Sequence, residues 1–108
     1  MAVWRRSAKW KRARIAALIE RDGPGCWLCT LPVPVQASAT RRGRRASLEH
    51  LQARAHGGRD GLDNLVLCHD ACNRHLADRP VEQKRKMREK WHREVRRRER
   101  MRINVPPA

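Results

Sequence analysis

The feature that most constrains the fold is a pair of Cys-rich clusters that lie far apart along the chain. The first is the segment Cys26-Trp27-Leu28-Cys29, and the second contains Cys68 and Cys72. A spacer of two residues lets both thiolates of the first cluster face one ion, as in a zinc knuckle. A redox dithiol has the same spacing, but the second cluster favours a metal. The sequence therefore predicts that Cys26, Cys29 and Cys72 share one structural zinc ion.

The fourth ligand of this ion is either His69 or Cys68. His69 would leave a spacer of two residues before Cys72, and Cys68 a spacer of three. Both spacings can close a tetrahedron, but the shorter one matches the first knuckle more closely. The sequence thus favours His69 and leaves Cys68 as an alternative. Such a closed site would tie the knuckle to the second cluster and supply stability to the fold.

The composition indicates that the fold needs a stabilising cross-link such as a bound metal ion. The chain has 108 residues and contains no Phe and no Tyr, so its aromatic core is limited to four Trp. This length suits a single domain, expected over residues 1–108, and a chain with so few large apolar groups usually needs a staple. No stretch has the pattern of a signal peptide or a membrane span. We therefore expect a reducing, cytoplasmic location, where paired Cys residues more often bind zinc than form disulfides.

The charge indicates the class of partner. The 26 Lys and Arg residues outnumber the 11 Asp and Glu residues, and the formal net charge of +15 exceeds what solubility requires. Such an excess predicts binding to a polyanion, with nucleic acid as the first candidate and an anionic membrane surface as the second. The apolar stripe of the last basic segment is too narrow for firm membrane insertion. The prediction is therefore a nucleic-acid partner and no membrane.

Hydrophobic spacing and breakers predict an α+β fold. Apolar residues recur at helical spacing near the N-terminus until Asp22-Gly23-Pro24-Gly25 ends the pattern. Short apolar strands flank a Gly-rich turn, and Pro80 suits the first position of a long last helix. We expect a core held together by the zinc site over about residues 23–79. The predicted elements are a basic helix over 3–21, strands over 46–51 and 65–67, a short helix over 71–77 and a basic helix over 80–102.

Between the two Cys clusters lies a basic loop. Pro32 and Pro34 exclude an interior strand in this region. Four arginines surround Gly43 and suit phosphate contacts. They are Arg41, Arg42, Arg44 and Arg45, and they are called the basic finger below.

A second, open metal site is predicted beside the zinc cluster. Glu49 offers a carboxylate next to His50, and Asn73 and His75 lie just beyond Cys72. If the two strands pair, the start of the short helix returns to the side of Glu49. A carboxylate with an amide or imidazole leaves coordination positions for water and a phosphate oxygen, as Mg²⁺ chemistry requires. His50 could then accept a proton from an attacking water.

These residues together resemble the HNH endonucleases of the ββα-metal fold, in particular the small phage and bacterial members with Cys/His zinc knuckles. The resemblance covers roughly residues 23–79. The motifs that carry it are Cys26-x2-Cys29, Glu49-His50, Gly57-Gly58, Asp63-Asn64-Leu65 and Cys72-Asn73.

The resemblance assigns a role to each motif. It implies that His50 is the general base and that Asn64 orients His50 by bonding the loop backbone. Asn73 takes the position of the second His of the His-Asn-His motif, which makes this an H-N-N variant. The resemblance then implies that Glu49 and Asn73 hold a divalent ion, Mg²⁺ or another such as Mn²⁺ or Ni²⁺. Glu49 stands where the family usually has Asp, and Asn73 where it usually has His, so His75 remains an additional candidate ligand.

The implied activity is divalent-metal-dependent hydrolysis of DNA phosphodiester bonds. Arg74 and the basic finger would bind the DNA backbone. Phage packaging or other DNA-processing proteins are further expected partners, in the cytoplasm of a bacterial or phage-infected cell. The alternative is a non-catalytic module that contains zinc and binds nucleic acid or assists packaging.

Overall fold

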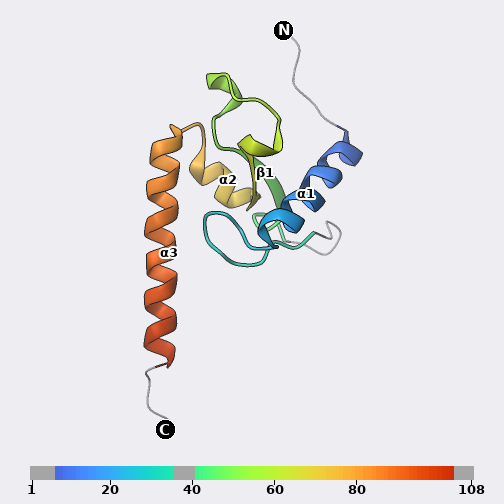
Figure 1. Ribbon diagram of the computed structural model, residues 1–108. Coiled ribbons are helices and arrows are strands. Elements are labelled where there is room, and N and C mark those ends of the chain that lie inside the picture. Colours follow the sequence, from blue (N-terminus) through green and yellow to red (C-terminus); the bar gives the residue numbers. More distant parts are fainter. Residues whose placement is uncertain (1–6, 36–40, 104–108) are drawn as a thin grey trace.

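The computed structural model describes residues 7–35 and 41–103 and has the predicted α+β architecture (Figure 1). Two short strands pair beneath two helices, and a long third helix extends away from them. The predicted fold class is therefore confirmed. In chain order the elements are α1 (Ala8–Asp22), β1 (Ala46–His50), the 3₁₀ turns η2 (Arg54–His56) and η3 (Leu62–Asn64), β2 (Leu65–His69), α2 (Asp70–Leu76) and α3 (Val81–Ile103).

The two strands form an antiparallel hairpin whose register runs from Ala46 opposite His69 to His50 opposite Leu65. All five residues of β2 are buried, because α1 and α2 both pack against the sheet. The α2 helix follows β2 without a loop, so the hairpin and helix form a ββα unit. In this register the last residue of β1, His50, lies opposite the first residue of β2, Leu65.

Local chemistry sets the bounds of α1. The Ser7 side chain accepts a hydrogen bond from the Trp10 backbone N–H at 3.0 Å, as an N-cap does. The helix ends at Asp22 and is followed by Gly23, whose φ of 86° favours glycine. Arg21 then donates to the carbonyl oxygens of Leu62 and Leu65, which fixes this helix end against the start of β2. The helix was predicted over 3–21, but it begins at Ala8, because the backbone of Ser7 is extended as an N-cap, and it ends at Asp22. Residues 3–6 lie outside the described part of the chain.

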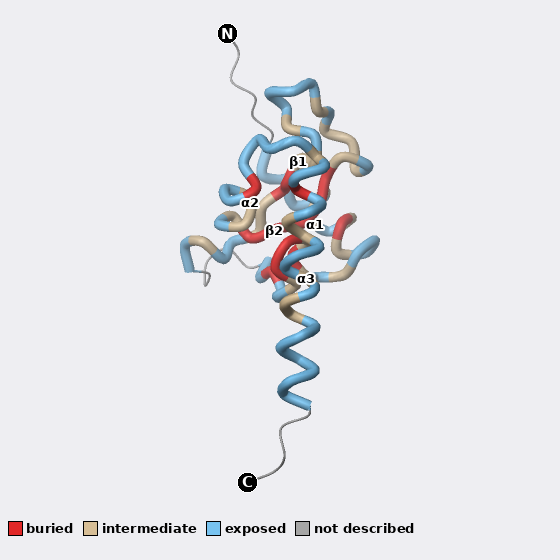
Figure 2. Tube along the Cα trace, turned by 90° about the vertical axis from the view of Figure 1, so that its left-hand side faces the viewer, coloured by how far each residue is buried: buried red, intermediate tan, exposed pale blue. Residues whose placement is uncertain are grey.

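The core is small and rich in sulfur. Leu18, Leu65, Leu76 and Cys68 are each fully buried. Buried residues concentrate around the hairpin and the Cys clusters, whereas much of the remaining surface is exposed (Figure 2). The core is therefore as thin as the composition predicts, and part of its buried volume consists of Cys side chains.

The α3 helix is anchored at its beginning and exposed at its end (Figures 1 and 2). Its 23 residues span about 35 Å at helical rise. Lys84 is buried in the globule, and Arg88 and His92 both contact the Trp27 carbonyl oxygen, at 3.0 and 3.1 Å. Beyond His92 the helix projects from the molecule. Within the described residues, no helix combines the length and apolar character that a membrane span needs.

Candidate functional site

Four ligand groups converge where the knuckle meets the end of β2. The Sγ atoms of Cys26, Cys29 and Cys72 and a ring nitrogen of His69 all lie within 4.8 Å of one another. His69 Nδ1 is 3.4 Å from Cys29 Sγ and 3.9 Å from Cys72 Sγ. Three thiolates and one imidazole form a donor set typical of structural zinc. These residues could therefore hold one metal ion.

Backbone contacts hold the ligands in place. The Trp27 N–H donates to the Leu67 carbonyl oxygen at 2.8 Å, which ties the knuckle to β2. The second ring nitrogen of His69, Nε2, donates to the Pro32 carbonyl oxygen at 3.0 Å. A ligand imidazole usually makes such a contact, because it fixes the ring and its tautomer. Nδ1 is consequently the nitrogen of His69 that faces the thiols.

Cys68 lies beside this cluster and is fully buried. Its thiol donates to the Cys26 sulfur and holds the pKa of Cys26 at about 3. Burial raises the pKa of Cys29, and burial together with the negative Cys26 raises the pKa of Cys72. Several ionised thiolates can share this space only if a cation offsets their repulsion. The structure therefore places His69 within the group of four ligand atoms and Cys68 outside it, next to Cys26.

A separate cleft of about 510 Å³ lies along β1 and is lined by Glu49, His50 and Asn73. Its wall also contains Trp10 and Lys11 from α1. The predicted hard-cation residues are therefore brought together around one space, which the order of residues in the sequence does not guarantee.

Glu49 is the buried acid of this cleft, with 2% of its surface exposed. Its Oε1 accepts a hydrogen bond from Lys84 Nζ at 2.8 Å, whereas its Oε2 is buried without a hydrogen-bond partner. Burial raises the pKa of Glu49, and the Lys84 ammonium opposes that effect. An unpaired buried carboxylate oxygen is costly. Oε2 thus fits a divalent cation, which would satisfy it.

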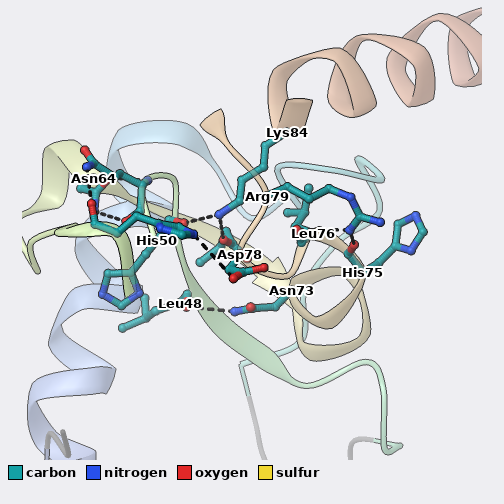
Figure 3. Close-up of polar contacts among 12 residues, drawn as sticks. Leu48, His50, Asn64, Asn73, His75, Leu76, Asp78, Arg79 and Lys84 are labelled. Carbon is teal, nitrogen blue, oxygen red and sulfur yellow. Dashed lines mark hydrogen bonds and ion pairs between the residues drawn. The ribbon is translucent and has the colours of Figure 1, made fainter. Parts of the chain in front are cut away.

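Asn73 reaches the same cleft from α2 (Figure 3). Its Nδ2 donates to Ser47 Oγ at 2.8 Å and to the Leu48 carbonyl oxygen at 3.0 Å. Because a carbonyl oxygen can only accept, this contact assigns the orientation of the amide. The amide oxygen of Asn73 is then the atom available to a cation.

His50 makes a hydrogen bond to Asp60 that the sequence did not predict. Its Nε2 lies 2.9 Å from Asp60 Oδ1, and both side chains are largely buried. Arg54 also bonds both carboxylate oxygens of Asp60, at 2.7 and 2.8 Å. When Nε2–H donates to the carboxylate, the neutral imidazole carries its basic lone pair on Nδ1.

Asn64 closes the loop that follows His50. Its Oδ1 accepts from the Gln52 N–H at 2.8 Å, and its Nδ2 donates to the carbonyl oxygens of Gln52 and Arg59 at 3.0 and 2.8 Å. Gly58 permits this tight loop, because a Cβ there would lie only 1.7 Å from the Gln52 oxygen. The predicted loop-backbone bonds of Asn64 are present, and they hold the loop next to His50.

The remaining predicted residues are exposed. His75 does not line the cleft, and its ring points away from Asn73 (Figure 3). The basic finger lies against the start of α2, where the Asp70 and Ala71 N–H groups donate to the carbonyl oxygens of Arg45 and Gly43. Arg74 lies on the same helix, 3.9 Å from Asp70. The finger and Arg74 therefore form one exposed basic surface.

Three residues of the cleft region have no distinguishing signal in the sequence. Lys84 belongs to a long run of Lys and Arg, and Asp60 lies in a turn where acids are common. Lys11 is one of several basic residues of α1. Only the folded chain separates these side chains from their neighbours of the same type.

Comparison with known proteins agrees with the resemblance. The family model described as HNH endonuclease matches residues 26–79, which is half of the 108-residue chain. The match includes both Cys clusters and the hairpin but not α1 or α3. No curated protein and no solved structure matches the chain significantly.

Proposed function

Because the chain belongs to the HNH endonuclease family, we propose that it is an active, divalent-metal-dependent endonuclease that hydrolyses DNA phosphodiester bonds. One observation carries the proposal. Glu49, His50 and Asn73 line a single cleft, and one oxygen of the Glu49 carboxylate is buried without a hydrogen-bond partner. A purely structural hairpin would have no need of such an atom.

His50 is the general base of the proposed reaction. Its Nδ1 accepts the proton of the water that attacks the phosphorus, and the ring becomes an imidazolium. Asp60, 2.9 Å from Nε2, stabilises that positive charge and holds the ring in one orientation. Asn64 acts on the same group indirectly, because it fixes the loop that begins after His50.

Glu49 and Asn73 would hold the divalent ion, through Oε2 and the amide oxygen. When bound, an ion such as Mg²⁺ or Mn²⁺ supplies a Lewis acid that stabilises charge on the scissile phosphate and the departing 3′ oxygen. The expected products are a 5′ phosphate and a 3′ hydroxyl. The Cys26, Cys29, His69 and Cys72 cluster would hold a structural zinc ion, since its closed thiolate-rich set leaves no position for substrate.

Positive side chains around the cleft fit a DNA substrate. Lys11 and Arg54 line it, and the basic finger and Arg74 are exposed nearby on α2 and its neighbouring loop. The projecting half of α3 adds Arg93, Arg96 and Arg100, all exposed. Such contacts neutralise phosphates without reading bases, so binding should depend strongly on salt.

The test is nicking of supercoiled plasmid by the zinc-loaded protein with added Mg²⁺ or Mn²⁺. Removal of a general base typically costs 10²- to 10⁴-fold in rate, so His50→Ala should lose cleavage by about that factor. The matched control is His56→Ala, because His56 is exposed in the same loop region and does not line the cleft. Equal cleavage by wild type and His50→Ala would refute the assignment of the base.

A non-catalytic nucleic-acid-binding module is the alternative, and one observation favours it. The Lys84 ammonium already pairs with Glu49 at 2.8 Å, and a positive charge there opposes a second cation. Under this alternative the wild-type protein would bind plasmid and leave it intact with every divalent metal tested. Metal-dependent cleavage that His50→Ala abolishes would exclude it.

A further inference from the structure

Lys84 is a fully buried cation in a basic helix that is mostly exposed. Its side chain has no exposed surface, whereas Arg85, Lys86 and Lys90 beside it on α3 are exposed. Burial of a lysine is costly unless its ammonium is well paired. Its Nζ donates to Glu49 Oε1 at 2.8 Å and to the His50 carbonyl oxygen at 2.7 Å. Lys84 lies outside residues 26–79, the part that the family model matches.

The consequence for Glu49 is an asymmetric carboxylate. Oε1 is occupied by the ammonium, and Oε2 is buried with no hydrogen-bond partner. The second Lys84 contact, to the His50 carbonyl oxygen at 2.7 Å, also holds the ammonium at the backbone of β1 (Figure 3). Glu49 can therefore offer a cation one oxygen and not two.

Cations differ in how they use a carboxylate. Ca²⁺ is large, accepts six to eight oxygen ligands and commonly takes both oxygens of one carboxylate. Mg²⁺ requires near-octahedral geometry, keeps several waters and usually takes one oxygen from each carboxylate; Mn²⁺ also suits carboxylate, carbonyl and water ligands. A carboxylate restricted to one oxygen thus favours the smaller ions.

We propose that Lys84 is a positioning residue that keeps Glu49 a single-oxygen ligand and so makes the cleft select Mg²⁺-sized cations over Ca²⁺. The inference rests on the proposed function, since it requires Glu49 to bind the divalent ion. The positive charge of Lys84 repels Ca²⁺ and Mn²⁺ alike. The ratio of their affinities therefore isolates the geometric effect from the electrostatic one.

The experiment measures metal binding by the full-length, zinc-loaded protein without DNA. Mn²⁺ binding is followed by the electron paramagnetic resonance signal of unbound Mn²⁺, and Ca²⁺ binding by competition with Mn²⁺. The proteins are the wild type, Lys84→Met, Lys84→Gln, Glu49→Gln and the exposed control Lys86→Met. Partners of metal ligands typically affect affinity ten- to hundredfold. Lys84→Met and Lys84→Gln should therefore raise the Ca²⁺-to-Mn²⁺ affinity ratio by about tenfold or more, and Lys86→Met should leave it unchanged.

The outcomes separate this inference from the proposed function. Retention of Mn²⁺ binding by Glu49→Gln would show that the ion binds elsewhere, and both proposals would fail. Loss of binding in Glu49→Gln with an unchanged ratio in both Lys84 variants would overturn the role of Lys84 alone. A purely structural role would weaken both ions equally.

A measurement on the wild type covers the case in which both Lys84 variants fail to fold. Infrared difference spectra with ¹³C-labelled Glu, recorded on addition of Mg²⁺ and compared with Glu49→Gln, report whether the Glu49 carboxylate binds through one oxygen or two. The wide separation of stretching bands typical of single-oxygen binding is expected. The narrow separation of a two-oxygen complex would overturn the proposal.

Discussion

Substitution of one knuckle cysteine tests how much of the fold depends on zinc. Cys26 is buried, and its Sγ lies within 4.8 Å of the other three ligand atoms. Cys68 is also buried and lies against Cys26, but it is outside that group. Cys26→Ser and Cys68→Ala therefore form a matched pair, because both remove a buried sulfur and only the first removes a proposed ligand.

The two substitutions should differ clearly in magnitude. Structural zinc sites contribute about 10–16 kcal/mol on binding, so one of four ligands accounts for about 3 kcal/mol. A domain of this size has about 5–15 kcal/mol of stability in total. Cys68→Ala loses only packing and one weak hydrogen bond, about 1 kcal/mol. At about 4 °C for each kcal/mol, Cys26→Ser should lower the melting temperature by about 12 °C and Cys68→Ala by about 4 °C.

Thermal unfolding followed by circular dichroism, with zinc content measured on the same samples, makes the comparison. Cys26→Ser should lose zinc and stability together, and Cys68→Ala should keep one zinc per chain. A Cys26→Ser protein that retains its zinc and melts like the wild type would show that the knuckle is not a metal site. Loss of zinc from Cys68→Ala, together with its retention in His69→Ala, would identify Cys68 as the fourth ligand.

Three further predictions follow from the cleft and the basic surfaces. Asp60→Asn keeps the shape of the loop but removes the charge that faces the His50 imidazolium, so plasmid cleavage should slow by about 10²-fold with unchanged plasmid binding; an unchanged rate would contradict the role of Asp60. Asn64→Ala removes three bonds to backbone, at about 1 kcal/mol each, and urea unfolding should show a loss of about 2–3 kcal/mol; a loss below 1 kcal/mol would show that the loop closes without it. Replacement of both Arg96 and Arg100 by Gln should reduce the slope of log binding constant against log salt by about 2, as measured by fluorescence anisotropy on duplex DNA, and an unchanged slope would place the projecting half of α3 away from DNA.

Motifs whose geometry is local could be recognised from the sequence. The two-residue spacer of Cys26 and Cys29 places both thiols on one side of a turn whatever the rest of the chain does. Antiparallel pairing of the predicted strands then brings Asn73, just after β2, back beside Glu49 on β1. Charge and helical periodicity likewise follow from composition and order alone. The bounds of α2 and α3 lie within one residue of those predicted, whereas α1 begins at Ala8 and not at residue 3, because Ser7 caps it.

Tertiary structure decided which of several equivalent side chains take part. Lys84 and Lys86 are indistinguishable in a run of basic residues, and only the packing of α3 against the hairpin buries Lys84 against Glu49, 35 positions away. Asp60 reaches His50 because Asn64 and Gly58 fold the loop tightly. His69 Nδ1 joins the cluster of four ligand atoms, whereas Cys68 contacts only the Cys26 sulfur at its edge. The sequence determined the kinds of ligand present, whereas long-range packing determined which individual groups meet, since contact between distant residues depends on how whole elements dock.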